Sequence, residues 1–306
     1  MGGTRHPAAA SKRASEQTLM RTTGPAASPN SKRPARIAIS FPHAEAGLDQ
    51  DEEWFIAEID GRRRRLRIHD YDELYRVPGL YEALVYDTLE CTSPRRISDL
   101  LESVLADWPL SPAGLRVLDL GAGNGCVAEV LRGLKVPHIV GLDLIPEACD
   151  AARRDRADVY DDYLVADLCD LTPVQNETLR GHRLNCLITV AALGYGDVPP
   201  LAFGTAFNLI RSPGWLAMTI KEDFLDPDDQ SGFARLMRRM IDEGVVAIQA
   251  HHRYCHRRSI NGEQLFYVAV VARKDRDVPR SWLDDTADVG SEIGHEPDHA
   301  SLLLGR

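Results

Sequence analysis

The stretch Val117-Leu118-Asp119-Leu120-Gly121-Ala122-Gly123-Asn124-Gly125 decides the fold of this chain. It begins as an apolar run of strand length, ends in a turn with three glycines, and leads into the helical pattern Val127 to Leu131. A strand, a glycine-rich turn and a helix in this order form the ligand-binding unit of parallel α/β sheets, because glycine lets the backbone approach a nucleoside closely. We therefore expect a Rossmann-like sheet with a nucleoside site at this turn.

The spacing of the glycines indicates which class of nucleoside ligand the turn would bind. The turn reads G-x-G-x-G with an acid two residues before the first glycine, whereas the dinucleotide dehydrogenase fingerprint is G-x-G-x-x-G. No G-K-[ST] follows, as a triphosphate-binding loop would require. The spacing thus speaks against an NAD-dependent dehydrogenase and against a nucleotide kinase.

Further apolar runs of strand length alternate with helical stretches along the chain. This alternation is typical of a parallel sheet with crossover helices. Two longer β-rich runs near the end, joined by a turn around Asn261-Gly262, read as an antiparallel hairpin that closes the sheet. The expected strands are 115–120, 138–142, 163–166, 186–190 and 215–220, followed by the hairpin 245–254 and 264–272.

The next two strand-like runs also end in an acid. Asp143 follows the run 140–142, and Asp167 follows the run 164–166. Open α/β sheets bind ligands at the carboxyl ends of their strands, so these acids and Asp119 are expected at one edge. A carboxylate there can accept both ribose hydroxyls of an adenosine, which suits Asp143, or the amine of adenine, which suits Asp167. Each acid alone also fits a helix N-cap or a solvated loop, so the assignment depends on all three.

Residues 115 to about 221 resemble the core of class I S-adenosylmethionine-dependent methyltransferases. The stretch quoted above resembles the first motif of the family, Asp143 its ribose-binding acid, and 166–168 its adenine-contacting motif. The resemblance implies an α/β fold with a Rossmann-like, seven-stranded, mostly parallel sheet and an antiparallel closing strand. It also implies S-adenosylmethionine as the cofactor, held by Asp119, Gly121, Ala122, Gly123, Asn124, Gly125, Asp143, Leu144, Ala166, Asp167, Leu168, Val190 and Tyr71. Tyr71 or Tyr75 would cover the cofactor as part of a lid, with plain packing as the equal alternative.

The acceptor side is less defined. Tyr195 and Asp197 follow the fourth strand, where the family transfers its methyl group, and either contact the acceptor or only form a tight turn. The segment departs from the [DNS]-P-P-[YFW] motif of methyltransferases that act on amino groups of nucleobases or glutamine. This departure argues against such substrates. On the sixth strand, alternation places His252, Tyr254 and His256 on one face, and we take His252 as a candidate base. No acid accompanies the histidines, so we expect no metal site.

Composition divides the chain into four parts. Residues 1–50 are expected to be a disordered arm, because prolines interrupt any helical period and apolar residues are sparse. A hairpin around Asp60-Gly61 and a helical cap are expected over 51–110, with Arg62 to Arg65 on a solvated face. The methyltransferase domain follows over 111–274, and a disordered acidic tail over 275–306.

The charge and the cysteine pattern limit which partners and which cellular compartment can be expected. The formal net charge is −10, so the chain lacks the excess of basic residues that is typical of nucleic-acid-binding proteins. The six cysteines occur singly, as in a reducing compartment, and no run approaches the roughly 20 apolar residues that cross a bilayer. We therefore expect a cytoplasmic enzyme without a membrane or nucleic-acid partner; an organellar transit peptide is the minor alternative for the first 40 residues.

Together these features predict methyl transfer to a small-molecule acceptor by in-line displacement. The reaction mainly requires that the acceptor be held in line with the methyl group, and a hydroxyl or amine acceptor also needs a base. Because the sequence does not single out any residue as that base, a non-catalytic regulatory protein that binds S-adenosylmethionine is the alternative. The sequence predicts neither the acceptor nor the oligomeric state.

Overall fold

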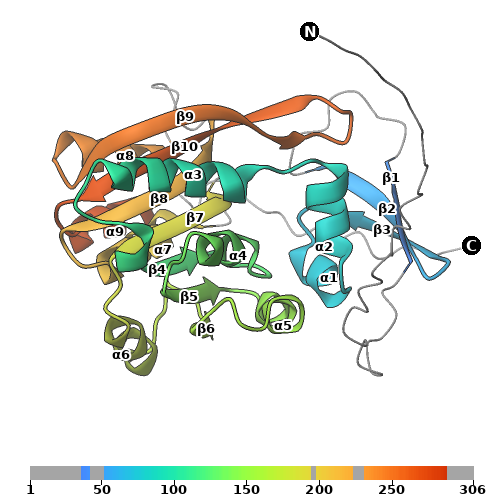
Figure 1. Cartoon of the computed structure of the whole chain (residues 1–306), viewed down its shortest axis with the longest axis horizontal. Helices are drawn as coiled ribbons and strands as arrows, with labels where there is room; N and C mark the ends of the chain where they lie inside the picture. Colours follow the sequence, from blue (N-terminus) through green and yellow to red (C-terminus); the bar gives the residue numbers. More distant parts are fainter. Residues whose placement is uncertain (1–35, 42–51, 194–197, 223–230, 288–306) are drawn as a thin grey trace, which may run out of the picture. The chain divides into compact units, whose positions relative to one another are not determined.

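A seven-stranded sheet forms the centre of the computed structural model, which describes residues 36–41, 52–193, 198–222 and 231–287 (Figure 1). The strand order is β6-β5-β4-β7-β8-β10-β9, and β10 alone runs in the direction opposite to the other six strands. The predicted fold class is therefore confirmed. The strands are β4 (Arg116–Leu120), β5 (His138–Asp143), β6 (Asp162–Val165), β7 (Cys186–Leu193), β8 (Gly214–Lys221), β9 (Val246–Arg258) and β10 (Gln264–Lys274).

Helices cover both faces of this sheet. Successive residues of a strand point to opposite faces, so Val117 packs with Ile97 of α3 in one apolar cluster, while Leu118 packs with Phe203 of α7 in another. All four side chains are fully buried, and each such burial contributes about 1.5–3 kcal/mol. The helices are α3 (Ser93–Ala106), α4 (Cys126–Gly133), α5 (Pro146–Asp155), α6 (Pro173–Gly181), α7 (Pro200–Leu209), α8 (Gly232–Asp242) and α9 (Arg280–Ala287), and a short 3₁₀ turn, η2 (Pro112–Gly114), precedes β4.

The predicted closing hairpin is present, and β9 extends four residues further than expected. Its pairing with β10 is irregular near the turn: Cys255 pairs with Phe266 and Arg257 with Leu265, which leaves His256 unpaired between them. Such a bulge redirects a side chain and is common next to active sites.

The N-terminal part forms a separate three-stranded sheet, β1 (Ile37–Ser40), β2 (Trp54–Ile59) and β3 (Arg62–Arg67), and a helical segment, α1 (Tyr71–Arg76), α2 (Leu80–Glu82) and the π-helical turn η1 (Ala83–Thr88). Asp60 and Gly61 both have positive φ, 50° and 81°, as a two-residue hairpin turn requires, so the predicted hairpin is confirmed. Arg62 to Arg65 are exposed, as expected.

Two segments that the sequence predicted to be disordered contain regular secondary structure within the described residues. Strand β1 lies inside the segment 1–50, where it pairs with β2 and packs Ile37 and Ile39 on the apolar cluster of the cap. Helix α9 lies inside the segment 275–306, where Trp282 and Leu283 are buried against the sheet domain. Both elements are short apolar patterns in polar surroundings, so average composition concealed them. The rest of the expected arm and tail lies outside the described residues.

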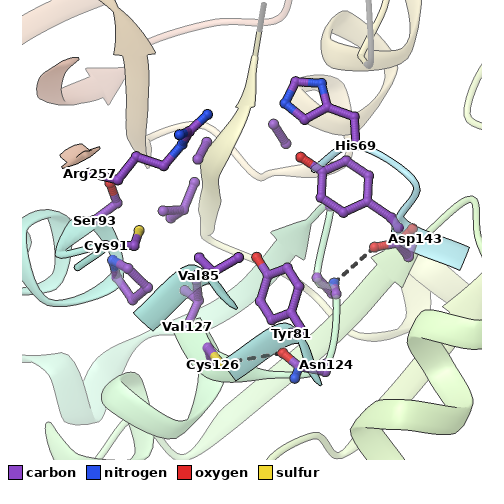
Figure 2. A pocket seen from close by; sticks show the side chains of 18 of the residues that line it. His69, Tyr81, Val85, Cys91, Ser93, Asn124, Cys126, Val127, Asp143 and Arg257 are labelled. Carbon is purple, nitrogen blue, oxygen red and sulfur yellow. Dashed lines mark hydrogen bonds between the residues drawn. The ribbon is translucent and has the colours of Figure 1, made fainter. Parts of the chain in front are cut away.

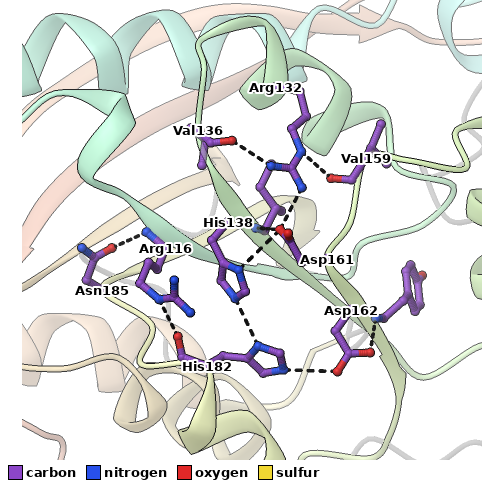
Figure 3. A network of polar contacts seen from close by, with 11 residues as sticks. Arg116, Arg132, Val136, His138, Val159, Asp161, Asp162, His182 and Asn185 are labelled. Atoms are coloured by element: carbon purple, nitrogen blue, oxygen red, sulfur yellow. Dashed lines mark hydrogen bonds and ion pairs between the residues drawn. The ribbon is translucent and has the colours of Figure 1, made fainter.

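A polar network ties together the amino ends of β4, β5 and β6 (Figure 3). Nε2 of His138 lies 3.1 Å from Nδ1 of His182, and Nε2 of His182 lies 3.2 Å from a carboxylate oxygen of Asp162. On the other side, Asp161 accepts hydrogen bonds from Arg132 and from the amide of Ile139. The network therefore stabilises the sheet at the amino ends of these strands. The glycine turn lies at the opposite edge, at their carboxyl ends.

Candidate active site

The glycine turn leaves the sheet where β4 ends and enters α4 at Cys126. Gly121 and Gly123 have φ of +70° and +52°, a region that L side chains rarely adopt. A Cβ on Gly121 would lie 2.8 Å from Cβ of Ala192, and one on Gly123 would lie 2.6 Å from the Tyr75 hydroxyl. Both glycines are therefore required for the turn to fit between β7 and the cap.

Asp143 stands at the end of β5 beside this turn. Its carboxylate accepts hydrogen bonds from the amide of Gly123 at 2.8 Å and from the amide of Ile145 at 3.0 Å. Burial raises the pKa of Asp143, and these amide bonds oppose the rise. A carboxylate has about four lone-pair sites, so two remain for a ligand.

Asp119 is fully buried beneath the turn, inside β4. One carboxylate oxygen accepts a hydrogen bond of 2.8 Å from the Tyr160 hydroxyl, and the other has no partner among the described residues. Burial raises the pKa of Asp119 to about 7, and the nearby Asp143 adds to the rise. Two acids crowded in this way favour a cationic ligand above them.

A cavity of about 270 Å³ extends from this turn along the carboxyl ends of the strands (Figure 2). Its wall comes from five strands or strand ends, in the spatial order β5, β4, β7, β10 and β9, and from the cap. Eight of the predicted cofactor residues line it: Gly121, Ala122, Gly123, Asn124, Asp143, Leu144, Val190 and Tyr71. The structure thus brings the first motif and the ribose-binding acid to one cavity.

Five other predicted cofactor residues do not line the cavity. Asp119 lies behind it, and Gly125 starts α4 with φ +90° against Val159. Asp167 is exposed, and its side chain accepts a bond from the amide of Cys169 at 2.8 Å. Its neighbours Ala166 and Leu168 are buried in the domain. The third acid therefore does not converge with the other two in this structure.

Aromatic rings from the cap face the glycine turn across the cavity. Tyr71 stacks on His69 and on Tyr75, with ring centroids 5.6 and 6.2 Å apart, and Tyr75 contacts Tyr81 at 5.0 Å. Tyr81 in turn meets Tyr86 edge-on at 6.0 Å. All five rings line the cavity. The electron-rich faces of tyrosine rings attract cations, so this aromatic wall suits a positively charged ligand.

Sequence reasoning named Tyr71 and Tyr75 but missed Tyr81 and Tyr86. The latter pair lies on α2 and η1, where tyrosines at helical spacing look like ordinary packing residues. Their cavity-facing position follows from how the cap folds onto the turn.

Of the predicted catalytic residues, Tyr195 and Asp197 lie outside the described residues. The strand before them, β7, contributes its end to the cavity through Val190, Ala191, Ala192 and Leu193. Ala191 has φ +54°, and its amide bonds to Thr219 of β8 at 2.8 Å. The cavity wall at this end of the sheet is therefore bent backbone with small apolar side chains.

His252 is exposed on β9 and does not line the cavity. His256, four residues later, is 5% exposed and does line it. Nδ1 of His256 lies 2.6 Å from the Ser93 hydroxyl, which lies 2.6 Å from the Tyr254 hydroxyl. Strand alternation could not show that the bulged end of β9, and not His252, reaches the cavity.

A buried ion pair joins this end of β9 to the cap. Arg257 donates a hydrogen bond of 2.6 Å to Glu53, and the side chains are only 5% and 3% exposed. The other oxygen of Glu53 accepts a bond from the amide of Ile260 at 2.8 Å. Arg257 lines the cavity (Figure 2). Its charge is balanced by Glu53.

Metal-ligating clusters and membrane-spanning helices are both absent from the described residues. No three histidine, cysteine, aspartate or glutamate side chains gather there as a metal site would need. None of the described helices has the length and apolar character to cross a membrane.

The residues of the cavity fit S-adenosylmethionine. Its ribose hydroxyls match the two free lone-pair sites of Asp143, and the glycine turn leaves room where a Cβ would collide. The sulfonium and ammonium charges match the aromatic wall, and the buried carboxyl of Asp119 beneath the turn can favour them through the electrostatic field without direct contact. When bound, the cofactor supplies an activated methyl group. Asp143, the turn, Tyr71 and Tyr75 would hold it.

The fold and this cavity define a class, the Rossmann-like S-adenosylmethionine-dependent methyltransferases. A family model described as methyltransferase domain matches residues 92–263, and the chain belongs to that family. It is an S-adenosylmethionine-dependent methyltransferase with S-adenosylmethionine as its cofactor.

Several solved structures resemble the chain at low identity. A magnesium protoporphyrin IX methyltransferase from Synechocystis PCC 6803 with bound S-adenosylmethionine is 14% identical, with 60% of this chain and 79% of that chain covered and a TM-score of 0.41. A methyltransferase from Anabaena variabilis is 13% identical, with coverages of 68% and 96% and a TM-score of 0.44. One from Mesorhizobium loti is 18% identical, with coverages of 56% and 96% and a TM-score of 0.40. No match was found among curated proteins.

Proposed function

We propose that the enzyme transfers the methyl group of S-adenosylmethionine to a small-molecule acceptor by in-line displacement. The observation that carries this proposal is the single cavity that runs from Asp143 and the glycine turn to His256 and Tyr267. One end suits the cofactor, and the other is walled by β7, β9 and β10, which the cofactor motifs do not explain.

An acceptor bound in that second half would meet the methyl group inside one enclosure. The rate gain would come from orientation, since effective concentrations in well-aligned sites are worth about 7–11 kcal/mol. Tyr86 and Ile68 of the cap also line the cavity, and a cavity of about 270 Å³ supports a small-molecule acceptor over a folded protein or a duplex. The net charge of −10 also supports a partner other than nucleic acid.

We further propose Tyr195 and Asp197 as contacts to the acceptor, because they follow directly on the cavity-lining end of β7. A cytoplasmic site of action is proposed on the six free cysteines.

The test is a methyl-transfer assay with radiolabelled cofactor and the full chain. Cell extract is separated into a fraction below 1 kDa, a protein fraction and an RNA fraction, and each is offered as acceptor. Label incorporated into the small-molecule fraction supports the proposal. Label only in protein or RNA contradicts it, and cofactor binding without any transfer favours the non-catalytic alternative.

A further inference from the structure

Residues of η1, α3, β9 and β10 that belong to none of the cofactor motifs form a further part of the cavity wall. We call it the β9 subsite and define it by Val85, Tyr86, Pro94, His256 and Tyr267, all of which line the cavity. Its surface is mainly apolar or aromatic, and the polar groups that line the cavity there are His256 and the neighbouring Ser93, Cys91 and Arg257. A ligand there would therefore present a flat, mainly apolar body and one hydrogen-bonding group.

The imidazole of His256 is held in a fixed orientation. Its Nδ1 lies 2.6 Å from the Ser93 hydroxyl and 3.7 Å from the thiol of Cys91, and its ring lies 4.1 Å from that of Tyr267. Ser93 continues the chain to Tyr254 at 2.6 Å. Nε2 makes no hydrogen bond to the described part of the chain, although the residue is only 5% exposed. A buried nitrogen in a cavity wall that lacks a partner is suited to one on a ligand.

The subsite carries no net charge among its described residues. Arg257, next to His256, is neutralised by Glu53 at 2.6 Å. Burial and the positive charge of Arg257 lower the pKa of His256 to about 3, so this histidine is neutral at pH 7. The titratable groups that face it are Cys91, Tyr254 and Tyr267, and burial raises the pKa of the first two. A charged acceptor would enter without a counter-ion, which is costly in a buried site.

We propose that the β9 subsite binds an uncharged phenol and that Nε2 of His256 takes the proton of its hydroxyl during methyl transfer. This inference rests on the proposed function and names its acceptor. The proposal includes the tautomer with the proton on Nδ1: Nδ1–H then donates to the Ser93 hydroxyl 2.6 Å away, and the lone pair of Nε2 is left for the phenol.

The step balances without a further reactant. An oxygen lone pair of the phenol forms the bond to the methyl carbon, while the bond from sulfur to that carbon breaks and its electron pair stays on sulfur. The O–H proton passes to Nε2, and the products are an aryl methyl ether, S-adenosylhomocysteine and a protonated imidazole that releases its proton to solvent. A weak base suffices, because the oxygen becomes strongly acidic as the new bond forms.

The experiment compares two phenols of different acidity with the full chain. At pH 8.5, 4-methylphenol is still mostly un-ionised, whereas 4-nitrophenol is largely ionised and needs no base. We expect His256→Asn to reduce kcat/KM for 4-methylphenol about 100-fold, the scale of general-base catalysis, and to reduce that for 4-nitrophenol less than about 10-fold. With 4-methylphenol the activity of the variant should rise with pH as the phenol ionises.

His252→Asn is the matched control, since it changes an exposed histidine of the same strand outside the cavity. It should leave both rates and the pH profile unchanged. Calorimetry with S-adenosylhomocysteine, run on each variant, shows whether the cofactor half is intact.

Equal losses for both phenols in His256→Asn would overturn the role of the histidine as a base. Transfer to benzoates or benzylamines but to neither phenol would overturn the acceptor class and leave the proposed function standing. Failure to bind the cofactor at all would remove the proposed function itself.

Discussion

The backbone amide of Gly123 donates a hydrogen bond of 2.8 Å to the carboxylate of Asp143. This bond joins the turn after β4 to the end of β5, so the acid and the glycine turn hold each other in place before any ligand arrives. A site fixed in advance loses less entropy when its ligand binds. Most consequences of the structure for cofactor binding follow from this relationship.

Replacing Asp143 with alanine should weaken the binding of S-adenosylhomocysteine by about 1.5–3 kcal/mol, the range for a lost hydrogen bond to a charged group. The variant also leaves the amides of Gly123 and Ile145 without their acceptor. Equilibrium dialysis with labelled S-adenosylhomocysteine measures the effect. An unchanged Kd would remove Asp143 from the ribose site.

Asp167→Ala provides the comparison at the next strand end. Because Asp167 is exposed and does not line the cavity, we expect a smaller loss than for Asp143→Ala in the same dialysis. A loss as large as that of Asp143→Ala would restore Asp167 to the adenine site that the sequence suggested for it.

Asp119 should make cofactor binding depend on pH. Its pKa in the folded protein is raised to about 7 by burial, and a cationic ligand favours the ionised form. Binding of S-adenosylmethionine at pH 6.5 should therefore release a proton, and affinity should rise from pH 6 to pH 8. Calorimetry in two buffers of different ionisation enthalpy counts the protons, and Asp119→Asn should release fewer.

The same group affects stability with the opposite sign. An acid whose pKa is raised on folding binds its proton more tightly in the folded state, so stability falls as pH rises from about 4, the unfolded pKa, to about 7. Denaturant titrations should show a shallower fall for Asp119→Asn. An identical pH dependence in both proteins would contradict the assignment.

Removing one member of the buried pair Glu53–Arg257 should strongly destabilise the fold. Glu53→Ala leaves a buried guanidinium without its partner, and we expect the free energy of unfolding to fall by about 3–5 kcal/mol. Glu90→Ala breaks the exposed pair with Arg258, 2.8 Å long, and should cost less than about 1 kcal/mol. Urea titration of both variants gives the comparison, and similar losses would show that burial does not govern the first pair.

His138, at the amino end of β5, should make the fold sensitive to acid. Burial and the nearby Arg116 lower the pKa of His138. A histidine whose pKa falls on folding resists protonation in the folded state, so stability declines as pH drops below about 6.5, the unfolded value. His138→Asn should lose less unfolding free energy between pH 8 and pH 5.5 than the wild-type chain. A larger loss of unfolding free energy in the variant than in the wild-type chain would contradict this prediction.

The fold was predictable because its signals are local and periodic. The strand and turn around Gly121 and the alternation of the later strands fix the sheet. The glycine turn and Asp143 were predictable for the same reason, since the strand ends of a parallel sheet meet at one edge. Strand β1 was missed because its four residues gain their stability from pairing with β2, a contact that no local pattern encodes.

The acceptor half of the cavity could not be read from sequence in the same way. His256 reaches it through a bulge in β9 and a hydrogen bond to Ser93, more than 160 positions away. Simple alternation gives no means of choosing between His252 and His256. The choice depends on where the cap covers the strand, which is a tertiary property.

The central claim is that the cavity between the glycine turn and the cap binds S-adenosylmethionine. Isothermal titration of the full chain with the cofactor tests it most directly. We predict saturable binding at one site per chain, and absence of detectable heat up to millimolar cofactor at two temperatures would contradict the claim.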